Sequence, residues 1–305
     1  MTKFLSSVKN KIIFSKTLPK IYTFVTRPFD KSLRNIVDFR NIVPEKIKKV
    51  SVVVPNYNYA KFLNARIDSI VNQTYPIYEL IILDDKSTDN SDAVINKKID
   101  ELKKTHSDIK IKYIINRKNT GSPILQWKKA FAESIGDYVW IAEADDLSDP
   151  RFLEKVMPAF DDKEVVLSYS DSVAINDSDN VLHYHFSSRA GKYCKKHFKN
   201  SFVVDGMQER ELCLNRRCTI PNVSAVVFRK SEKIPYGQYL EEAGKFSQVG
   251  DWYLYLKLAR HGKISFTHES LNYFRIHKSS ATREKARKDK HLEEIAYIQD
   301  HLDMI

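Results

Sequence analysis

Paired carboxylates follow a run of large apolar residues in the stretch DYVWIAEADDLSDP, at 137–150. The apolar run is typical of a buried strand, and Glu143, Asp145 and Asp146 come directly after it. A carboxylate without a partner beside an apolar core is costly, because burial disfavours its charged form. An oxygen-rich cluster of this kind suits a hard cation such as magnesium or manganese, which would in turn hold a diphosphate. The alternative is a solvated strand end.

Two further polar clusters also follow apolar runs. PNYNYA begins at the end of the run 50–55, and DDKSTDN ends the run 78–85. The ring of Tyr57 offers a face on which a base can stack. The carboxylate of Asp85 only accepts hydrogen bonds, which suits the imide N–H of uracil or thymine, or the N–H edge of guanine. If the three clusters converge, they could bind the base and the diphosphate of one nucleotide. This interpretation is favoured over three unrelated solvated loops.

The elements that must position these clusters alternate along the chain. Short β-branched or aromatic runs predict strands, and apolar residues at helical spacing predict helices between them. The predicted strands are 50–55, 78–85, 111–116 and 137–142, and the predicted helices are 60–72, 91–104 and 122–135. This alternation predicts an α/β, Rossmann-like and mostly parallel sheet with helices on both faces, where ligands bind outside the carboxyl ends of the strands. Neither GxGxxG nor GxxxxGK[ST] occurs, which excludes a standard dinucleotide binder and a P-loop enzyme.

The second half predicts a smaller antiparallel part. VVLSYSDSVAI and VLHYHF flank the turn NDSDN as a hairpin, and FVVDG, NVSAVVF, KISFT and LNYFRI are further predicted strands. Helices are expected at 207–216, at 250–262, where Gly262 ends the pattern, and at 282–303, which is charged and amphipathic.

Charge is concentrated at the N-terminus. The chain of 305 residues carries a net charge of +11. Residues 1–49 hold nine Lys and three Arg against two Asp and one Glu, so that 12 − 3 = +9 and the remainder carries 11 − 9 = +2. This basic extension either lies on an anionic membrane surface or packs on the domain as a helical extension. The body of the chain is not strongly basic, and no nucleic-acid partner is expected.

The cysteines and the N-terminus bear on the compartment. Three cysteines are odd in number and sparse, so a disulfide framework is not expected and a reducing compartment is favoured. Cys213 and Cys218 are spaced unlike a zinc site and lack evident partners. Lys9 and Lys11 interrupt the only N-terminal apolar stretch, which argues against a signal peptide. The expected location is cytoplasmic, with peripheral attachment to the inner face of the plasma membrane through 1–49 as an open alternative.

The order of these motifs resembles family 2 glycosyltransferases with the GT-A fold. The resemblance rests on VVVPNYNYAKFLNARIDSIVNQTYPIYELIILDDKSTDNS, then NTG, then GDYVWIAEADD. It covers residues 50–280, with 50–150 as the nucleotide-sugar half and 151–280 as the acceptor half, and leaves out the extension 1–49 and the last helix 281–305. NVSAVVFRK, GDWYLYLKLAR and LNYFRIHKSSAT also resemble members that build bacterial surface polysaccharides.

The resemblance implies a role for each matching position. Donor-binding residues would be Pro55, Tyr57, Asn58 and Asp85 at the nucleoside, Asp84 supporting their turn, and Asp145 with Asp146 at the metal and diphosphate. Asp251 matches the general base that deprotonates the acceptor hydroxyl, and His277 or Arg275 would offset the charge of the leaving group. Two positions depart from the family: Glu143 replaces an aspartate in the metal block, and Gly250 replaces a second acidic residue beside the base.

The resulting prediction is an inverting glycosyltransferase that depends on a divalent cation, manganese or magnesium. It would transfer a sugar from a nucleoside-diphosphate donor, expected to be a UDP-sugar, to a hydroxyl of a glycan or lipid-linked acceptor. One alternative is a nucleotidyltransferase, although PNYNYAKF lacks the glycine-rich loop of that class. Another is an inactive nucleotide-sugar-binding scaffold, against which the retention of all the acidic positions argues. Asp251 also has an alternative as a helix N-cap.

Overall fold

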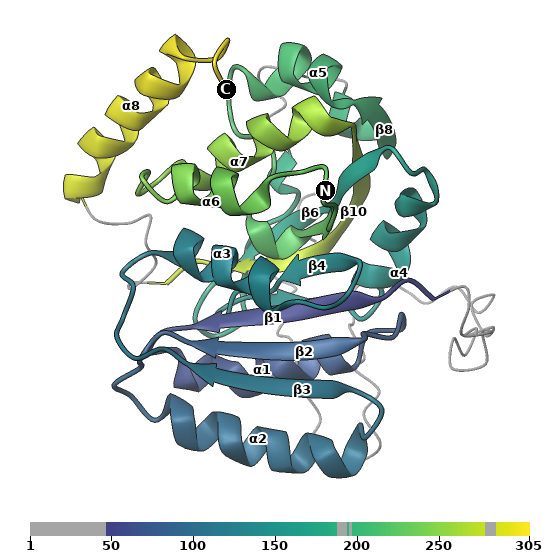
Figure 1. The fold of residues 1–305 in the computed structure, drawn as a ribbon, viewed down its shortest axis with the longest axis vertical. Helices are drawn as coiled ribbons and strands as arrows, with labels where there is room; N and C mark the ends of the chain where they lie inside the picture. The colour runs from purple at the N-terminus through teal and green to yellow at the C-terminus, as the bar shows by residue number, and fades with distance from the viewer. Residues whose placement is uncertain (1–46, 188–193, 195–196, 278–284) are drawn as a thin grey trace, which may run out of the picture.

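The computed structural model describes residues 47–187, 194, 197–277 and 285–305, and the ribbon is shown in Figure 1. Its strands form one ten-stranded sheet in the order β3-β2-β1-β4-β9-β6-β10-β5, with β7 paired to β6 and β8 paired to β10. The strands are β1 (Val50–Asn56), β2 (Glu79–Asp84), β3 (Lys110–Ile115), β4 (Tyr138–Ile141), β5 (Leu147–Ser148), β6 (Val165–Ile175), β7 (Val181–His183), β8 (Phe202–Asp205), β9 (Val226–Arg229) and β10 (Lys263–Arg275).

The first half of the sheet is parallel, as the alternation of elements predicts. β1 pairs with β2 and with β4, and β2 pairs with β3, all in parallel. The helices that connect these strands are α1 (Ala60–Val71), α2 (Ser91–Thr105) and α3 (Pro123–Glu133). In this register Asn56 lies opposite Asp84, so the polar clusters after β1 and β2 begin at the same edge of the sheet. The mostly parallel α/β fold is confirmed.

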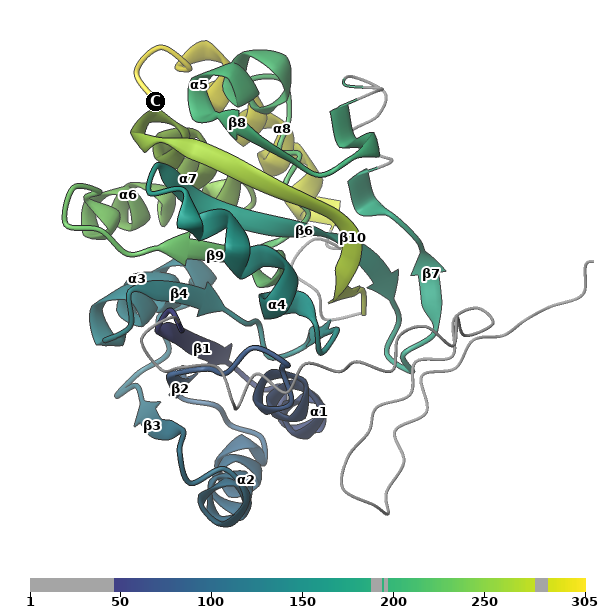
Figure 2. The same ribbon diagram turned by 90° about the vertical axis from the view of Figure 1, so that its right-hand side faces the viewer.

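The helices cover both faces of the sheet, which explains the near-continuous apolar runs of its strands. In β1, Val52 and Val54 belong to the apolar cluster that contains α1 and α2, and Val53 belongs to the cluster on the other side that contains α3. Figure 2 shows α3, α6 (Tyr236–Ala243) and α7 (Gly250–Leu258) on one side of the sheet and α1 and α4 (Phe152–Val156) on the other.

The second half of the sheet is mainly antiparallel. β9 runs antiparallel to both β4 and β6, whereas β6 and β10 are parallel. The two short strands expected at KISFT and LNYFRI are one strand, β10, with register shifts between Thr267 and Ser270 and between Ser270 and Asn272. These irregularities absorb the polar segment between the two apolar runs without ending the pairing. The expected strand at 222–228 begins only at Val226, after a turn of 3-10 helix. The remaining helices are α5 (Gly206–Glu209) and α8 (Lys285–Asp300).

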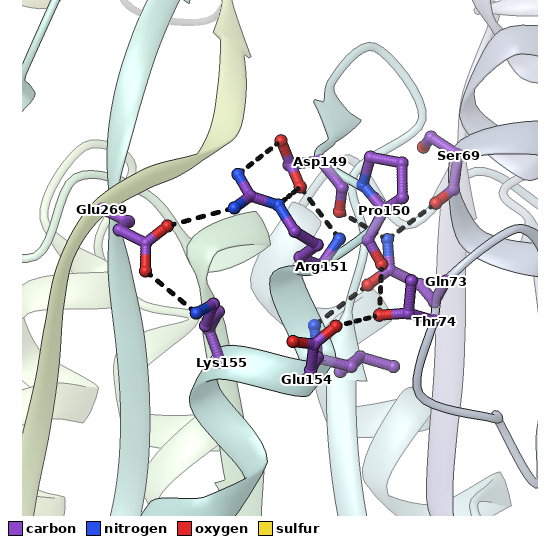
Figure 3. A network of polar contacts seen from close by, with 10 residues as sticks. Ser69, Gln73, Thr74, Asp149, Pro150, Arg151, Glu154, Lys155 and Glu269 are labelled. Carbon is purple, nitrogen blue, oxygen red and sulfur yellow. Dashed lines mark hydrogen bonds and ion pairs between the residues drawn. The ribbon is translucent and has the colours of Figure 1, made fainter. Parts of the chain in front are cut away.

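A polar network fixes the chain just after the acidic cluster, at the start of α4 (Figure 3). Gln73 Nε2, at the end of α1, donates to the carbonyl oxygens of Ser69 and Asp149, at 2.9 and 2.8 Å. The backbone N–H of Thr74 donates to the carbonyl oxygen of Pro150 at 2.8 Å. Arg151 reaches Glu269 in β10 at 3.4 Å. The segment that follows the acidic residues is therefore bonded to elements from both halves of the chain.

The structure bears on the expectations for the cysteines and for membrane-spanning segments. A disulfide joins Cys194 to Cys213, so the expectation of unpaired cysteines is wrong for this pair, because sequence spacing does not show which thiols the fold brings together. Within the described ranges, no helix has the length and apolar character needed to cross a membrane. The membrane-surface hypothesis rests on residues 1–49, and residues 1–46 of that extension lie outside the described residues.

Gly136 sets how closely β4 approaches β1, and it supplies a test of this fold. A Cβ atom at Gly136 would lie 2.7 Å from the carbonyl oxygen of Lys49 and 2.7 Å from Ser51 Oγ. We expect Gly136→Ala to lower the free energy of unfolding by about 1–3 kcal/mol, because the strands must separate to admit the methyl group. Urea unfolding followed by circular dichroism measures this loss. Gly237→Ala is the matched control, since a Cβ there meets nothing within 4 Å, and equal stability of the two variants would contradict the packing argument.

Candidate active site

The loops after β1 and β2 are bonded to each other. Asn56 Nδ2 donates to Asp84 Oδ2 at 2.7 Å, and Asp84 Oδ1 accepts from the backbone N–H of Ser87 at 2.8 Å. Asn58 adopts a left-handed backbone conformation, with φ of 61°, and its Oδ1 accepts from the N–H of Thr88 at 2.7 Å. Between these anchored residues the ring of Tyr57 is 44% exposed. Asp84 and Asn58 therefore hold a loop that presents Tyr57 to solvent, next to Pro55 at the end of buried β1.

Asp85 holds the NTG loop against the end of β2. Its carboxylate accepts from Asn116 Nδ2 at 2.7 Å, from the backbone N–H of Thr120 at 3.0 Å and from Thr120 Oγ1 at 2.8 Å. The N–H of Thr120 also lies 3.0 Å from Oδ2, so it is shared between the two oxygens, and each oxygen accepts two contacts. These contacts fix the orientation of a carboxylate that is only 4% exposed. Asn116 and Thr120 were not among the predicted site residues, although Thr120 lies in the NTG motif.

The acidic cluster follows β4, and its members have different partners. Glu143 Oε1 accepts from Trp127 Nε1 at 2.6 Å. Asp146 Oδ2 accepts from Asn222 Nδ2 at 2.6 Å, and its Oδ1 accepts from the backbone N–H of Arg275 at 2.9 Å. Both oxygens of Asp146 are thus bonded within the protein.

Asp145 is paired with an imidazole. Its Oδ2 lies 2.9 Å from His277 Nε2. The imidazole of His277 lies against the rings of Tyr59 and Phe62, with centroid separations of 5.4 and 5.5 Å. The two aromatic rings fix the imidazole beside the carboxylate, so His277 and Asp145, which are far apart in sequence, form one unit.

Burial raises the pKa values of two of these carboxyl groups. The pKa of Glu143 rises to about 8 and that of Asp146 to about 7, first because burial disfavours the charged form and second because Asp145 adds a like charge. The neighbouring guanidinium of Arg66 opposes both shifts. The cluster therefore holds more negative charge than its protein partners neutralise.

Arg66 is a site residue that the sequence analysis missed. It is fully buried, its Nη1 donates to Ser148 Oγ at 2.9 Å, and its guanidinium lies 5.3 Å from the ring centroid of Trp140. Burial lowers the pKa of Arg66 to about 10, whereas the charge of Asp146 opposes that shift. A signal was present, because position 66 falls on the apolar face of α1 with Leu63 and Ile70. A cation on such a face requires a buried anion, and the acidic cluster supplies one.

Arg275, the last residue of β10, joins this strand to the end of β4. Its Nε donates to the carbonyl oxygen of Asp145 at 2.6 Å, and its Nη1 donates to that of Asn176 at 2.7 Å. The side chain is 2% exposed. Its Nη1 also forms an ion pair with Asp179 Oδ1 at 2.6 Å. The guanidinium is therefore engaged by two backbone carbonyls and by a carboxylate outside the cluster, whereas the imidazole of His277 contacts a carboxylate of the cluster.

Asp251 lies in the first turn of α7. Val249 occupies the N-cap position, so the alternative that Asp251 is the N-cap is wrong. Its Oδ1 accepts from the N–H of Trp252 at 2.7 Å, and burial raises its pKa to about 6. A Cβ at Gly250 would lie 2.7 Å from the carbonyl oxygen of Ala243. The missing second acidic residue thus has a steric reason, because α7 packs too closely on α6 to admit a side chain there.

Tyr255 relates Asp251 to the acidic cluster. It lies one turn further along α7, and its pKa is raised well above the usual value, chiefly by burial and then by nearby negative charges that include Asp251 and Glu143. Tyr255 therefore lies within the electrostatic influence of both Asp251 and Glu143. Asp251 itself is a half-buried carboxylate with a raised pKa at the start of α7.

The family follows from a direct match. Residues 51–217 match the family model for glycosyl transferase family 2, which is more than half of the chain. The chain therefore belongs to glycosyl transferase family 2, and it is a glycosyltransferase.

Individual relatives agree with this assignment. An uncharacterized glycosyltransferase of Nostoc sp. is 29% identical, over 83% of this chain and 76% of the relative. The poly(ribitol-phosphate) beta-N-acetylglucosaminyltransferase TarP of Staphylococcus aureus is 34% identical, but over 35% of this chain and only 32% of its own length. The crystal structure of S. aureus TarS 1-349 in complex with UDP-GlcNAc shares the fold, with a TM-score of 0.58 and 17% identity, over 84% of this chain and 69% of that chain.

The raised pKa of Glu143 predicts how stability depends on pH when EDTA removes divalent cations. The unfolded pKa, about 4.5, lies below the folded value of about 8. The protonated carboxyl therefore contributes stability that is complete below pH 4.5 and is lost as the pH rises to about 8. Glu143→Gln removes this titration but keeps an acceptor for Trp127. We expect the variant to gain up to about 1.4 kcal/mol per pH unit relative to wild type over this window. Urea unfolding at several pH values measures the difference, and parallel curves would contradict it.

Proposed function

We propose that this glycosyltransferase inverts the anomeric centre and depends on a divalent cation. It takes a sugar from a nucleoside diphosphate, specifically a UDP-sugar, and transfers it to a hydroxyl of a glycan or lipid-linked acceptor. The observation that carries this proposal is the carboxylate cluster after β4, in which Asp145 is paired with His277 at 2.9 Å. The cluster at the end of β4 suits a diphosphate with its cation, and Asp251 suits a general base.

The donor site is proposed along the ends of β1 and β2. Tyr57 would stack on the base, and Asp85, with its orientation fixed by Asn116 and Thr120, would accept the imide N–H of uracil. Adenine presents ring acceptors at the corresponding edge, which a carboxylate does not bind. The crystal structure of TarS with UDP-GlcNAc supports a uridine donor on this fold.

The cation is assigned to the acidic cluster because the residues fit it. Burial leaves Glu143 and Asp146 with raised pKa values, and a nearby cation would favour their charged forms. Asp145 uses Oδ2 for His277, so we assign its Oδ1 to the cation, with Glu143 as a second ligand. Asp146, with both oxygens bonded, contributes charge and position. A bound manganese or magnesium ion would stabilise the negative charge that develops on the departing diphosphate.

The chain's own residues account for the other steps. With a pKa of about 6, Asp251 is mostly ionised at neutral pH and can take the proton from an acceptor hydroxyl as that oxygen attacks the anomeric carbon. Attack from the face opposite the diphosphate inverts the configuration in a single displacement. His277, held against Asp145, would donate to the departing diphosphate, whereas Arg275 orients the loop that carries both aspartates.

The acceptor is proposed to be a bacterial surface polymer or its lipid-linked precursor. The support is the name of TarP, which describes transfer to poly(ribitol-phosphate), together with the sequence resemblance of the acceptor half. The sugar and the linkage are set by residues between β6 and α7.

Asp251→Asn tests the base. The amide keeps the size of the carboxylate but takes no proton, so we expect kcat to fall about 10²–10⁴-fold while the Kd for the nucleotide stays near the wild-type value. In the wild type, kcat/KM should rise with pH through about 6 as Asp251 ionises. Transfer assays with a nucleotide-sugar panel and calorimetry with UDP measure the two quantities. Undiminished transfer by the Asn variant would remove Asp251 from the mechanism, and retention of anomeric configuration would exclude single displacement.

Asp145→Asn tests the cation site. Without its full charge, the cluster should bind UDP in the presence of manganese at least about tenfold more weakly, since one charge-assisted interaction is worth roughly 1.5–3 kcal/mol. In EDTA, wild type and variant should bind UDP with similar affinity. Calorimetry with and without manganese gives both comparisons. Full wild-type transfer in excess EDTA would show that the cluster works without a cation.

A further inference from the structure

Four side chains with metal-binding atoms meet away from the candidate active site. Cys194 and His197 are spaced C-x2-H just before β8, and Glu209 and Cys213 are spaced E-x3-C on α5 and the π-helical turn Arg210–Leu214 that continues it. His197 Nε2 lies 2.6 Å from Glu209 Oε2. The ligand atoms of His197, Glu209 and Cys213 all lie within 4.8 Å of one another, and Cys194 is bonded to Cys213.

Two members of the group are buried, the other two are half-buried, and one carboxylate oxygen lacks a partner. Glu209 and Cys213 are each 1% exposed. Among the residues that the structure describes, Glu209 Oε1 is buried without any hydrogen-bond partner. Leaving a buried carboxylate oxygen unsatisfied is costly, so this atom indicates a ligand that it would bind. The ring of Phe202 stacks on His197 at a centroid separation of 4.1 Å, which closes the group off with an apolar wall.

We propose that, with the disulfide reduced, Cys194, His197, Glu209 and Cys213 bind one zinc ion. Zinc in structural sites takes four ligands in a tetrahedron, drawn from cysteine sulfur, histidine nitrogen and carboxylate oxygen. Soft thiolate ligands select zinc over magnesium or manganese, which distinguishes this group from the all-carboxylate cluster after β4. The two short ligand pairs, one on each segment, are the usual arrangement of a closed structural site.

The change from disulfide to zinc site balances with a dithiol as reductant. The dithiol supplies two electrons and two protons, which convert the Cys194–Cys213 bond to two thiols, and it becomes a cyclic disulfide. Zinc then binds two thiolates, one carboxylate and one neutral imidazole, and the two thiol protons are released. Cys194 is therefore fastened to Cys213 in either state, by a covalent bond or through a metal ion.

The position of the site gives it a structural role near α7. The carbonyl oxygen of Leu214, the residue after Cys213, accepts from Trp252 Nε1 at 2.7 Å. Trp252 is the neighbour of Asp251 in the first turn of α7. A metal or disulfide at Cys213 thus anchors the turn that holds the start of this helix.

Cobalt(II) substitution in the full-length reduced protein tests the proposal. After removal of metal with EDTA and reduction with a dithiol, the wild type should bind one cobalt ion per chain with a thiolate-to-cobalt charge-transfer band, and zinc should abolish the band by displacement. The acidic cluster after β4 contains no sulfur, so it cannot produce this band. Cys194→Ser and Cys213→Ser should each weaken or lose it. Cys218→Ser is the matched control, because this half-buried thiol lies outside the group, and it should keep the band at full intensity.

A second measurement covers the case in which a cysteine variant does not fold. The oxidised wild type, folded by circular dichroism, should bind no thiolate-ligated cobalt, and dithiol should restore binding of one equivalent. Reduced, folded wild type without the band would overturn the proposal. So would a band that keeps its full intensity in Cys213→Ser or disappears in Cys218→Ser.

Discussion

The contact between the ends of β4 and β10 is the constraint on which the rest of the site depends. Arg275 donates from its backbone N–H to Asp146 Oδ1 and from its side chain to the carbonyl oxygen of Asp145. These bonds join β10, late in the chain, to the polar loop that follows β4. They also determine where His277 lies, because it follows Arg275 by only two residues. Without them, Asp145 would lose its imidazole partner.

Burying the carboxylates after β4 has an electrostatic cost, which a bound cation would lower. Three carboxylates follow β4, and burial, together with the like charge of Asp145, keeps the pKa values of Glu143 and Asp146 raised although the guanidinium of Arg66 opposes both shifts. Protein sites of this kind are stabilised by binding a cation, because the bound charge favours the ionised forms. The proposed metal–diphosphate would therefore stabilise the fold as well as complete the site. The pKa of the candidate base, Asp251, is raised by burial alone, without the like-charge contribution that acts on the cluster. Asp251 can therefore accept a proton near neutral pH.

The acceptor side depends on close packing. Gly250 lets α7 approach α6, Trp252 is held by the carbonyl oxygen of Leu214, and Cys213 precedes that residue in a fastened segment. Each contact restrains the first turn of α7, where Asp251 lies. The proposed zinc site would belong to this restraint and would act through position, at a distance from the donor. The two proposed metal sites then differ in ligand chemistry and in role.

Much of this molecule could be predicted from the sequence, because local patterns carry the information. Strand and helix positions from β1 to β4 follow from β-branched runs and helical spacing, and the polar strand ends follow from the abrupt change of residue type. Tertiary structure decided the features that depend on contacts between segments far apart in the sequence. It joined KISFT to LNYFRI as one strand, because pairing with β6 continues across the bulges. It also bonded Arg66 to Ser148, about 80 residues away, within the electrostatic influence of the acidic cluster. It also paired Cys194 with Cys213, since thiol partners depend on distances between segments and not on spacing along the chain.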